Sequence, residues 1–187
     1  HGGATRVVCF VDEFTLCSGG DDDKLILLNM SDHSTRTIDA THEGMTDMVL
    51  IGDSFVTVGS DGEIHLWSYP LMNTENILRG HEDLIWAVDV LEGDRFVTAS
   101  QDGSVRWWSA RPSIPTTYES HSQMPASDMA FVWNDVLAVV SEFDTDMQLI
   151  DVQENTQSVI RSDGAELSSI LHIPNTSLAV TGDINGE

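Results

Sequence analysis

The chain has 187 residues, 41% of them hydrophobic, and a net charge of −23 from 31 acidic and 8 basic residues. This composition can form a buried core, which argues against disorder, and no apolar run reaches the roughly 18 residues of a membrane-spanning helix. The acidic charge argues against direct binding of nucleic acid or anionic membrane, because such binding depends on Lys and Arg.

Targeting and redox features predict an intracellular protein of the cytoplasm or nucleus. The sequence opens with His1-Gly2-Gly3 and not with a basic and then apolar leader, so secretion has no support. Cys9 and Cys17 are too few for a disulfide framework and lack metal-ligand spacing, so we expect buried free thiols. Because no histidine pair has His-x3-His spacing and no phosphate-binding loop is present, we expect no metal and no cofactor.

Five units of about 40 residues follow one another along the chain. A histidine recurs at intervals of 41, 39 and 40 residues, at His1, His42, His81 and His121. Residues 4–29 also align with residues 84–109 without a gap. A fixed period of this size indicates a solenoid, a propeller or an array. The predicted units are 1–40, 41–80, 81–120, 121–162 and an incomplete 163–187.

Short β-strands are predicted within each unit. In the third unit, apolar runs predict strands at Ile85–Val90, Arg95–Ala99 and Ser104–Ser109, and a weaker one near Thr116–Tyr118. Asp-Gly pairs at 61–62 and 102–103 are typical of tight turns between paired strands. Four antiparallel strands per unit form the blade of a β-propeller, so the predicted fold class is all-β.

Two units carry a specific signature. The third contains Gly80-His81, Thr98-Ala99-Ser100-Gln101-Asp102-Gly103 and Val105-Arg106-Trp107-Trp108-Ser109, and the second repeats the last two segments at 57–62 and 64–68. These segments resemble the WD-repeat family, and the resemblance covers essentially the whole chain. It implies a β-propeller with about four and a half four-stranded blades present of the seven that most members have. We therefore expect this chain to be a piece of a longer protein.

A hydroxyl, an imidazole and a carboxylate recur in the second and third units. Thr98, His81 and Asp102 could serve as nucleophile, base and orienting acid of an acyl-transfer site. The family resemblance instead implies a buried hydrogen-bond network that they complete with Trp108. A catalytic site would not need to recur at the blade period, so the second copy favours the network and argues against an enzyme. That copy comprises His42, Thr57, Asp61 and Trp67.

The remaining units depart from this pattern, and we expect their networks to be incomplete. The first keeps the His, hydroxyl and Asp but lacks the Trp, with His1, Ser18, Asp22 and Leu28. The fourth keeps only His and Asp, with His121, Val140, Asp144 and Ile150. The fifth has Asp163 in place of the His and Asn185 in place of the Asp.

The resemblance also implies a partner-binding face, formed by the loop before the first strand of each blade and the turn between its second and third strands. Counted from the His and Asp landmarks, the early first-strand positions are Arg6, Asp47, Trp86 and Asp128. The positions just before the turn Asp are Asp21, Ser60, Gln101 and Phe143. Trp and Arg are enriched where interfaces concentrate binding energy, but packing of Trp86 into the central channel alone is an equally weighted alternative.

These features predict a non-catalytic scaffold or adaptor that binds other proteins and no small-molecule substrate, with a coat or substrate-receptor subunit as the alternative. The segment Trp107–Pro115 resembles a passage of several histone-associated WD-repeat proteins, including the WD-repeat subunit of the methylosome. That resemblance implies an adaptor for an arginine methyltransferase. The acidic charge favours partners with basic segments, such as histone tails.

Overall fold

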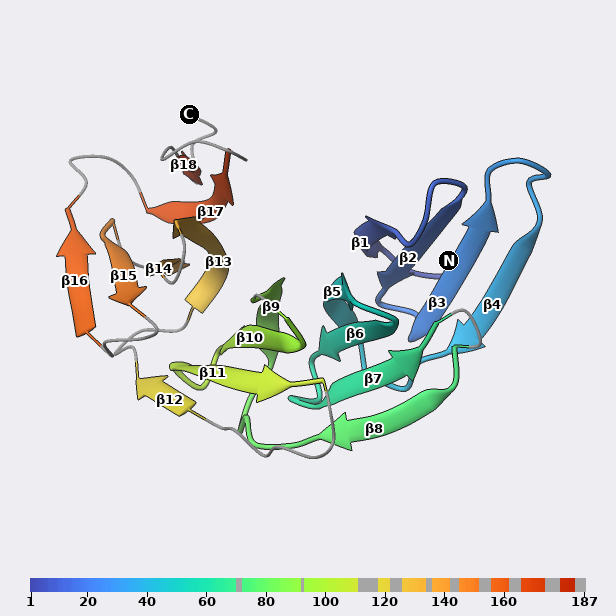
Figure 1. Ribbon diagram of the computed structural model, residues 1–187, viewed down its shortest axis with the longest axis horizontal. Helices are drawn as coiled ribbons and strands as arrows, with labels where there is room; N and C mark the ends of the chain where they lie inside the picture. The colour runs from blue at the N-terminus through green and yellow to red at the C-terminus, as the bar shows by residue number, and fades with distance from the viewer. Residues whose placement is uncertain are drawn as a thin grey trace.

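The computed structural model describes residues 1–69, 72–91, 93–110, 118–121, 126–133, 136–141, 145–151, 156–161, 166–173 and 179–183. Within these ranges the chain is all-β and contains no helix (Figure 1). Accordingly, these ranges include no helix that is long and apolar enough to cross a membrane.

The strands form five antiparallel sheets, and the strands of each sheet pair in chain order. The first sheet contains β1 (Thr5–Phe10), β2 (Thr15–Gly20), β3 (Lys24–Asn29) and β4 (Thr35–Asp39). The second contains β5 (Met45–Ile51), β6 (Ser54–Gly59), β7 (Ile64–Ser68) and β8 (Thr74–Leu78). The third contains β9 (Ile85–Val90), β10 (Arg95–Ser100), β11 (Ser104–Ser109) and β12 (Tyr118–His121). The fourth contains β13 (Ala126–Trp133), β14 (Val136–Ser141), β15 (Met147–Asp151) and β16 (Thr156–Ile160), and the fifth β17 (Leu167–His172) and β18 (Ala179–Asp183).

The sheets follow one another along an arc (Figure 1). The first strands of consecutive sheets, β1, β5, β9, β13 and β17, contact one another in chain order along the inside of this arc. Strands β4, β8 and β16 lie on its outside. Blades around the axis of a propeller have this arrangement. The fold class predicted from the repeat is therefore confirmed, as a partial propeller with four four-stranded sheets and a fifth sheet of two described strands.

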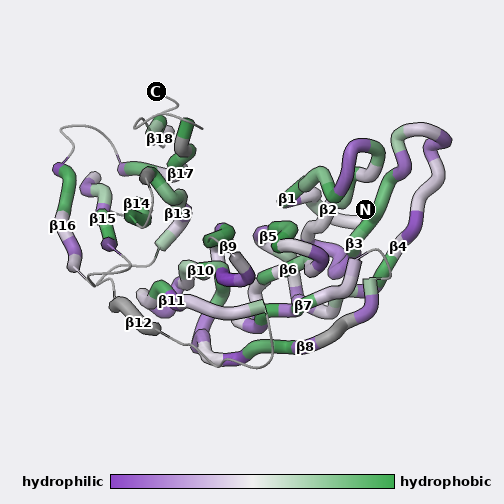
Figure 2. Tube along the Cα trace, viewed as in Figure 1, coloured by the Kyte–Doolittle hydropathy of each residue, from purple (hydrophilic) through white to green (hydrophobic). Residues whose placement is uncertain are grey.

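The hydrophobic core lies between neighbouring sheets. Successive residues of a strand point to opposite faces, so each inner sheet packs one face on the sheet before it and the other on the sheet after it. Cys17 and Leu25 of the first sheet, for example, contact the cluster that includes Phe55 and Trp67 of the second. Hydrophobic residues accordingly recur on the strands of every sheet (Figure 2). This packing fixes the orientation of each blade relative to the next.

The two Asp-Gly pairs lie in tight turns between second and third strands, as predicted. Gly103 N donates to Ser100 O at 3.2 Å, and Gly62 N donates to Gly59 O at 3.3 Å. Both turn glycines have positive φ, 80° for Gly103 and 71° for Gly62. Glycine adopts this conformation without the steric cost of a side chain. The chain can therefore reverse direction in a tight turn just before the third strand.

The strands predicted for the third unit agree with β9, β10 and β11 to within one residue. The fourth strand, β12, begins at Tyr118 and so lies later than the weaker strand predicted near Thr116–Tyr118, whose first two residues are outside the described ranges.

Cys9 and Cys17 are free thiols at facing positions of β1 and β2. Both contribute to the contact between the first and second sheets. Burial raises the pKa of Cys17 to about 12 and also raises the pKa of Cys9. The thiolate is the reactive form of cysteine, so these two thiols are packing residues of low reactivity.

Candidate functional site

In the third sheet, four side chains form a chain of hydrogen bonds from Trp108 to Asp102. Trp108 Nε1 donates to Thr98 Oγ1 at 2.7 Å, and His81 Nε2 lies 2.7 Å from the same oxygen. His81 Nδ1 lies 2.9 Å from Asp102 Oδ2. An indole N–H can only donate, so Thr98 accepts from Trp108; an ionised carboxylate can only accept, so in a neutral imidazole Nε2 is left without a hydrogen and accepts the Thr98 hydroxyl. His81 then has its hydrogen on Nδ1, which faces the carboxylate.

The second sheet repeats these contacts. Trp67 Nε1 donates to Thr57 Oγ1 at 2.9 Å, and His42 Nε2 lies 2.7 Å from that oxygen. His42 Nδ1 lies 3.1 Å from Asp61 Oδ1. The structure therefore brings together all eight residues that the sequence assigns to the two networks.

Asp102 receives several hydrogen bonds besides the His81 contact. Its carboxylate accepts the Ser104 hydroxyl at 2.6 Å, the Ser104 amide at 2.8 Å and the Glu82 amide at 3.0 Å. Partial burial alone would raise the pKa of Asp102, but hydrogen bonds from Ser104, Glu82 and His81 outweigh burial and hold the pKa well below its usual range. The ionised carboxylate thus joins the loop before β9 to the turn after β10.

The same geometry also fits a nucleophile, a base and an orienting acid, but both hydroxyls are closed to a substrate. Thr57 and Thr98 are each 0% exposed. Each hydroxyl is already held between an indole and an imidazole. A nucleophile must approach a substrate atom, so this placement supports the structural interpretation.

The first sheet keeps three members of the network joined. His1 Nε2 lies 2.9 Å from Ser18 Oγ, and His1 Nδ1 lies 2.7 Å from Asp22 Oδ1. The amide of Gly2 donates to the other carboxylate oxygen at 2.6 Å. With Leu28 in place of the Trp, the network is incomplete only in the indole.

The fourth sheet has an apolar pair where the network would lie. Val139 has the strand register of Thr98, and Ile150 has that of Trp108. The residue that replaces the hydroxyl is therefore Val139 and not Val140, which packs toward the fifth sheet. Because hydroxyl and indole are replaced together, no buried polar partner is left without a hydrogen bond at these two positions.

The other residues assigned to the fourth and fifth units are not placed in a network. His121 is the last residue of β12, where it follows Ser120 as Arg79 follows Leu78. In this register His121 is equivalent to Arg79, which lies two residues before His81, so His121 is not the counterpart of His81. Phe143, Asp144, Asp163 and Asn185 lie outside the described residues.

Each sheet has a β-bulge near the start of its first strand. The extra residues at these bulges are Arg6, Thr46, Trp86, Ser127 and Ser168. A bulge re-aims a side chain relative to the regular alternation of the strand. The five bulges therefore give one equivalent position per blade at the edge where the turn Asp also lies.

This register corrects two residues of the predicted partner face. The positions equivalent to Arg6 and Trp86 are Thr46 and Ser127, whereas Asp47 and Asp128 each lie one residue further along the strand. In the second unit, the count from the histidine is wrong because the loop from His42 to β5 is one residue shorter than the loop from His81 to β9.

Asp47 and Asp128 instead connect neighbouring sheets, and Asp89 does the same. Their Oδ2 atoms accept backbone amides of the next sheet, Asp47 from Val88 at 2.9 Å, Asp128 from Ile170 at 2.9 Å and Asp89 from Phe131 at 3.3 Å. Burial raises the pKa of Asp47 to about 7, and it raises the pKa of Asp89 and of Asp128 as well. These carboxylates are inter-blade contacts and not exposed partner contacts.

Long and short side chains behave differently at the bulge position. Ser127 and Ser168 donate to a carbonyl of the adjacent strand at 3.2 and 3.3 Å, whereas Thr46 Oγ1 lies 3.2 Å from Val58 O of the adjacent strand and 2.5 Å from Ile85 O of the next blade. Arg6 and Trp86 extend further, to the residue that follows the second strand of their own blade.

Two side-chain pairs therefore form, one on the first sheet and one on the third. Arg6 binds Asp21 through both carboxylate oxygens, with Nε–Oδ1 at 2.7 Å and Nη2–Oδ2 at 3.1 Å. Trp86 Nε1 donates to Gln101 Oε1 at 2.8 Å. Each long side chain is fixed by its neighbour, so both are oriented in the absence of a partner.

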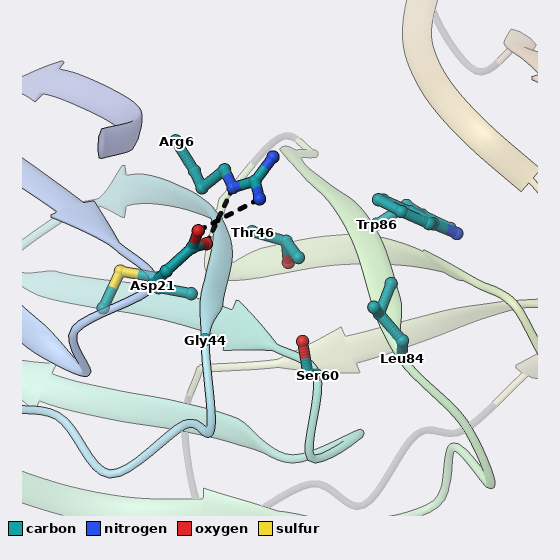
Figure 3. A pocket seen from close by; sticks show the side chains of 8 residues that line it. Arg6, Asp21, Gly44, Thr46, Ser60, Leu84 and Trp86 are labelled. Carbon is teal, nitrogen blue, oxygen red and sulfur yellow. Dashed lines mark hydrogen bonds and ion pairs between the residues drawn. The ribbon is translucent and has the colours of Figure 1, made fainter. Parts of the chain in front are cut away.

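A hollow of about 210 Å³ lies over the second sheet, between these two pairs (Figure 3). Arg6 and Asp21 line one side of it, and Leu84 and Trp86 line the other. Between them the second sheet contributes the short side chains of Thr46 and Ser60. The hollow thus combines an ion pair, hydroxyl groups and an aromatic ring.

Trp86 is oriented for contact at this hollow. It is 36% exposed, and its indole nitrogen points away from Arg6 (Figure 3). The hydrogen bond to Gln101 satisfies this polar atom, so the ring can present an apolar surface. Exposed acidic residues lie within two positions of the lining residues in the sequence, namely Glu43, Glu82 and Asp83.

Comparison with known proteins identifies one repeat directly. Residues 72–109 match the family described as WD domain, G-beta repeat. This segment contains the whole third-sheet network, from His81 to Trp108. No curated protein matches the chain. The chain therefore contains a WD repeat, a module that generally forms non-catalytic scaffolds for protein interactions.

Proposed function

We propose that this chain is a non-catalytic scaffold that binds other proteins through the face that contains the hollow over the second sheet. The observation that carries the proposal is that side chains at equivalent positions differ in length between adjacent blades. Fixed long side chains on the first and third sheets flank the short side chains of Thr46 and Ser60. Arg and Trp are the residue types that most often anchor an interface.

The rigidity of the propeller supports this proposal. Buried clusters between neighbouring sheets hold the backbone of each blade in place. The bulge places Arg6 and Trp86 at equivalent positions, on the same edge of their blades. Anchors that are already ordered lose less conformational entropy when a partner binds. The two hydroxyls inside the networks are buried, which supports binding over catalysis.

The partner that we propose carries a basic segment, such as a histone tail or another Lys- and Arg-rich chain. The net charge of −23 produces a negative potential that accelerates encounter with such chains and repels acidic ones. Exposed acids beside the hollow, including Glu43 and Asp83, would extend this potential to the binding face. Presentation of basic substrates to a modifying enzyme such as an arginine methyltransferase, in the cytoplasm or nucleus, is the setting that we propose.

Titration separates this function from non-specific binding. A labelled basic histone-tail peptide and a duplex DNA of similar length are each titrated with the protein at several salt concentrations. We expect saturable binding of the peptide that weakens as salt rises, and no binding of the DNA. Failure of the peptide to bind at low salt would contradict the proposed partner class.

A further inference from the structure

The second sheet contains a ligating side chain that its network does not use. His65, on β7, lies against His42 with the ring centroids 3.9 Å apart. One donor atom from each of His42, Asp61 and His65 lies within 4.8 Å of the other two. We propose that these three residues form a zinc-binding site, and that Glu63, which lies outside this group with its Oε2 3.5 Å from His65 Nε2, moves in as the fourth ligand.

The environment of His65 is the observation that suggests a bound ligand. It is 2% exposed, and its Nε2 atom is buried with no hydrogen-bond partner among the residues that the structure describes. Glu63 Oε2 lies 3.5 Å from this nitrogen, which is too long for a good hydrogen bond. A buried polar atom without a partner is unfavourable. Coordination to a metal ion would give this atom a partner.

The donor set and its spacing suit zinc. Zinc binds imidazole nitrogen and carboxylate oxygen at about 2.0–2.2 Å in a tetrahedron, so its ligand atoms lie about 3.3–3.6 Å apart. The pair His42 Nδ1 and Asp61 Oδ1 is at 3.1 Å, and the pair His65 Nε2 and Glu63 Oε2 is at 3.5 Å. The donor atoms of His42, Asp61 and His65 lie within 4.8 Å of one another, so binding would contract these distances by up to about 1 Å. Magnesium and calcium prefer sites made only of oxygen.

Zinc binding is compatible with the hydrogen-bond network. An ion on His42 Nδ1 takes the place of the hydrogen there, and that hydrogen moves to Nε2, so the imidazole changes tautomer and stays neutral. His42 then carries its hydrogen on Nε2 and donates to Thr57 Oγ1. The Thr57 hydroxyl has two lone pairs, so it accepts from both His42 and Trp67.

The third sheet provides a matched comparison within the same chain. It has the same His and Asp pair, but Arg106 and Ser104 stand at the register positions of His65 and Glu63. Neither of them supplies the imidazole or carboxylate of the second sheet. The proposed site is therefore a property of the second blade and not of the repeat. Glu63, whose side chain is 29% exposed, lies between the site and solvent, where its Oε1 accepts Arg79 Nε at 2.6 Å.

Cobalt titration of the full chain tests this proposal. Co²⁺ is added in the presence of excess Mg²⁺, which occupies surface carboxylates, and the visible absorption is recorded before and after Zn²⁺. We expect one Co²⁺ per chain with the absorption of a four-coordinate site, displaced by Zn²⁺. His65→Gln should weaken binding at least tenfold, roughly, whereas Arg106→Gln at the matched position should leave it unchanged. No visible absorption from the wild type, or equal affinity in His65→Gln, would overturn the proposal.

Folding of the variants is checked by circular dichroism. Should His65→Gln fail to fold, Glu63→Gln replaces it, because its partly exposed side chain can be changed without opening the core. Weaker Co²⁺ binding by Glu63→Gln, by several-fold or more, supports the site. Unchanged binding by a folded Glu63→Gln then overturns it.

Discussion

Arg6 and Trp86 occupy the same β-bulge position in the first and third blades, on either side of a blade whose bulge residue is the shorter Thr46. Each of the two reaches the residue after the second strand of its own blade. The repeat thus holds the backbone constant and varies side-chain length at one position. This variation creates a local hollow on a rigid scaffold, which is how a repeated fold acquires a specific surface.

The network makes a prediction about buried hydroxyls. Replacing Thr98 with Val should lower the free energy of unfolding by about 1–3 kcal/mol, because Trp108 Nε1 and His81 Nε2 each lose a partner. The reverse change, Val139→Thr in the fourth sheet, should also destabilise, because it buries a hydroxyl beside Ile150 in an apolar cluster. Urea unfolding monitored by tryptophan fluorescence measures both. Unchanged unfolding midpoints in the two variants would show that hydroxyl position does not matter.

Asp102→Asn should destabilise the protein at neutral pH by about 1–3 kcal/mol, since the ionised carboxylate accepts three hydrogen bonds besides the His81 contact. Its pKa is lowered in the folded state, so the unfolded chain takes up the proton first as pH falls. The wild-type advantage is therefore present above about pH 4 and declines below it. Thermal or urea unfolding from pH 7 to pH 3 measures this decline. Glu82→Gln, at an exposed neighbour, serves as the control, and an equal loss in the control would contradict the assignment.

Asp47 should make an opposite contribution to pH dependence. Burial raises its pKa to about 7, so between about pH 4 and pH 7 the folded state holds a proton that the unfolded chain has released. Its contribution to stability then falls as pH rises through this window, by at most about 1.4 kcal/mol per pH unit. Asp47→Asn should remove this slope. Urea unfolding at several pH values compares it with the wild type and with Asp53→Asn, an exposed control in the same blade. Parallel pH profiles for wild type and Asp47→Asn would show that Asp47 ionises normally.

The fold and the networks can be predicted from the sequence because their landmarks lie at nearly constant spacing. His81 and Asp102 bracket two paired strands. Trp67 and Trp108 each follow the turn Asp of their own blade by the same number of residues, which places a third strand in each blade. Apolar alternation then gives the strand faces. Nothing in this reasoning depends on contacts between distant segments.

The bulge positions that we propose as the partner face can be predicted only in part. Arg6 and Trp86 are found by counting from their histidines, but the same count misplaces Asp47, because it crosses a loop of different length before the bulge.

The contact between His42 and His65 cannot be predicted by ligand spacing, because strand pairing brings these residues together from 23 positions apart. Short-range ligand motifs do not detect such pairs.

The contribution of Trp86 to peptide affinity tests the scaffold proposal most directly. Fluorescence anisotropy of a labelled basic histone-tail peptide is measured with wild type, Trp86→Ala and Phe14→Ala at low salt. Phe14 is a matched control, because it is 52% exposed in the β1–β2 turn, at the opposite edge of the blades from the hollow. We predict that Trp86→Ala weakens binding about tenfold or more, that Phe14→Ala binds like the wild type, and that both variants keep the wild-type circular dichroism. Wild-type affinity in a folded Trp86→Ala variant would contradict the account.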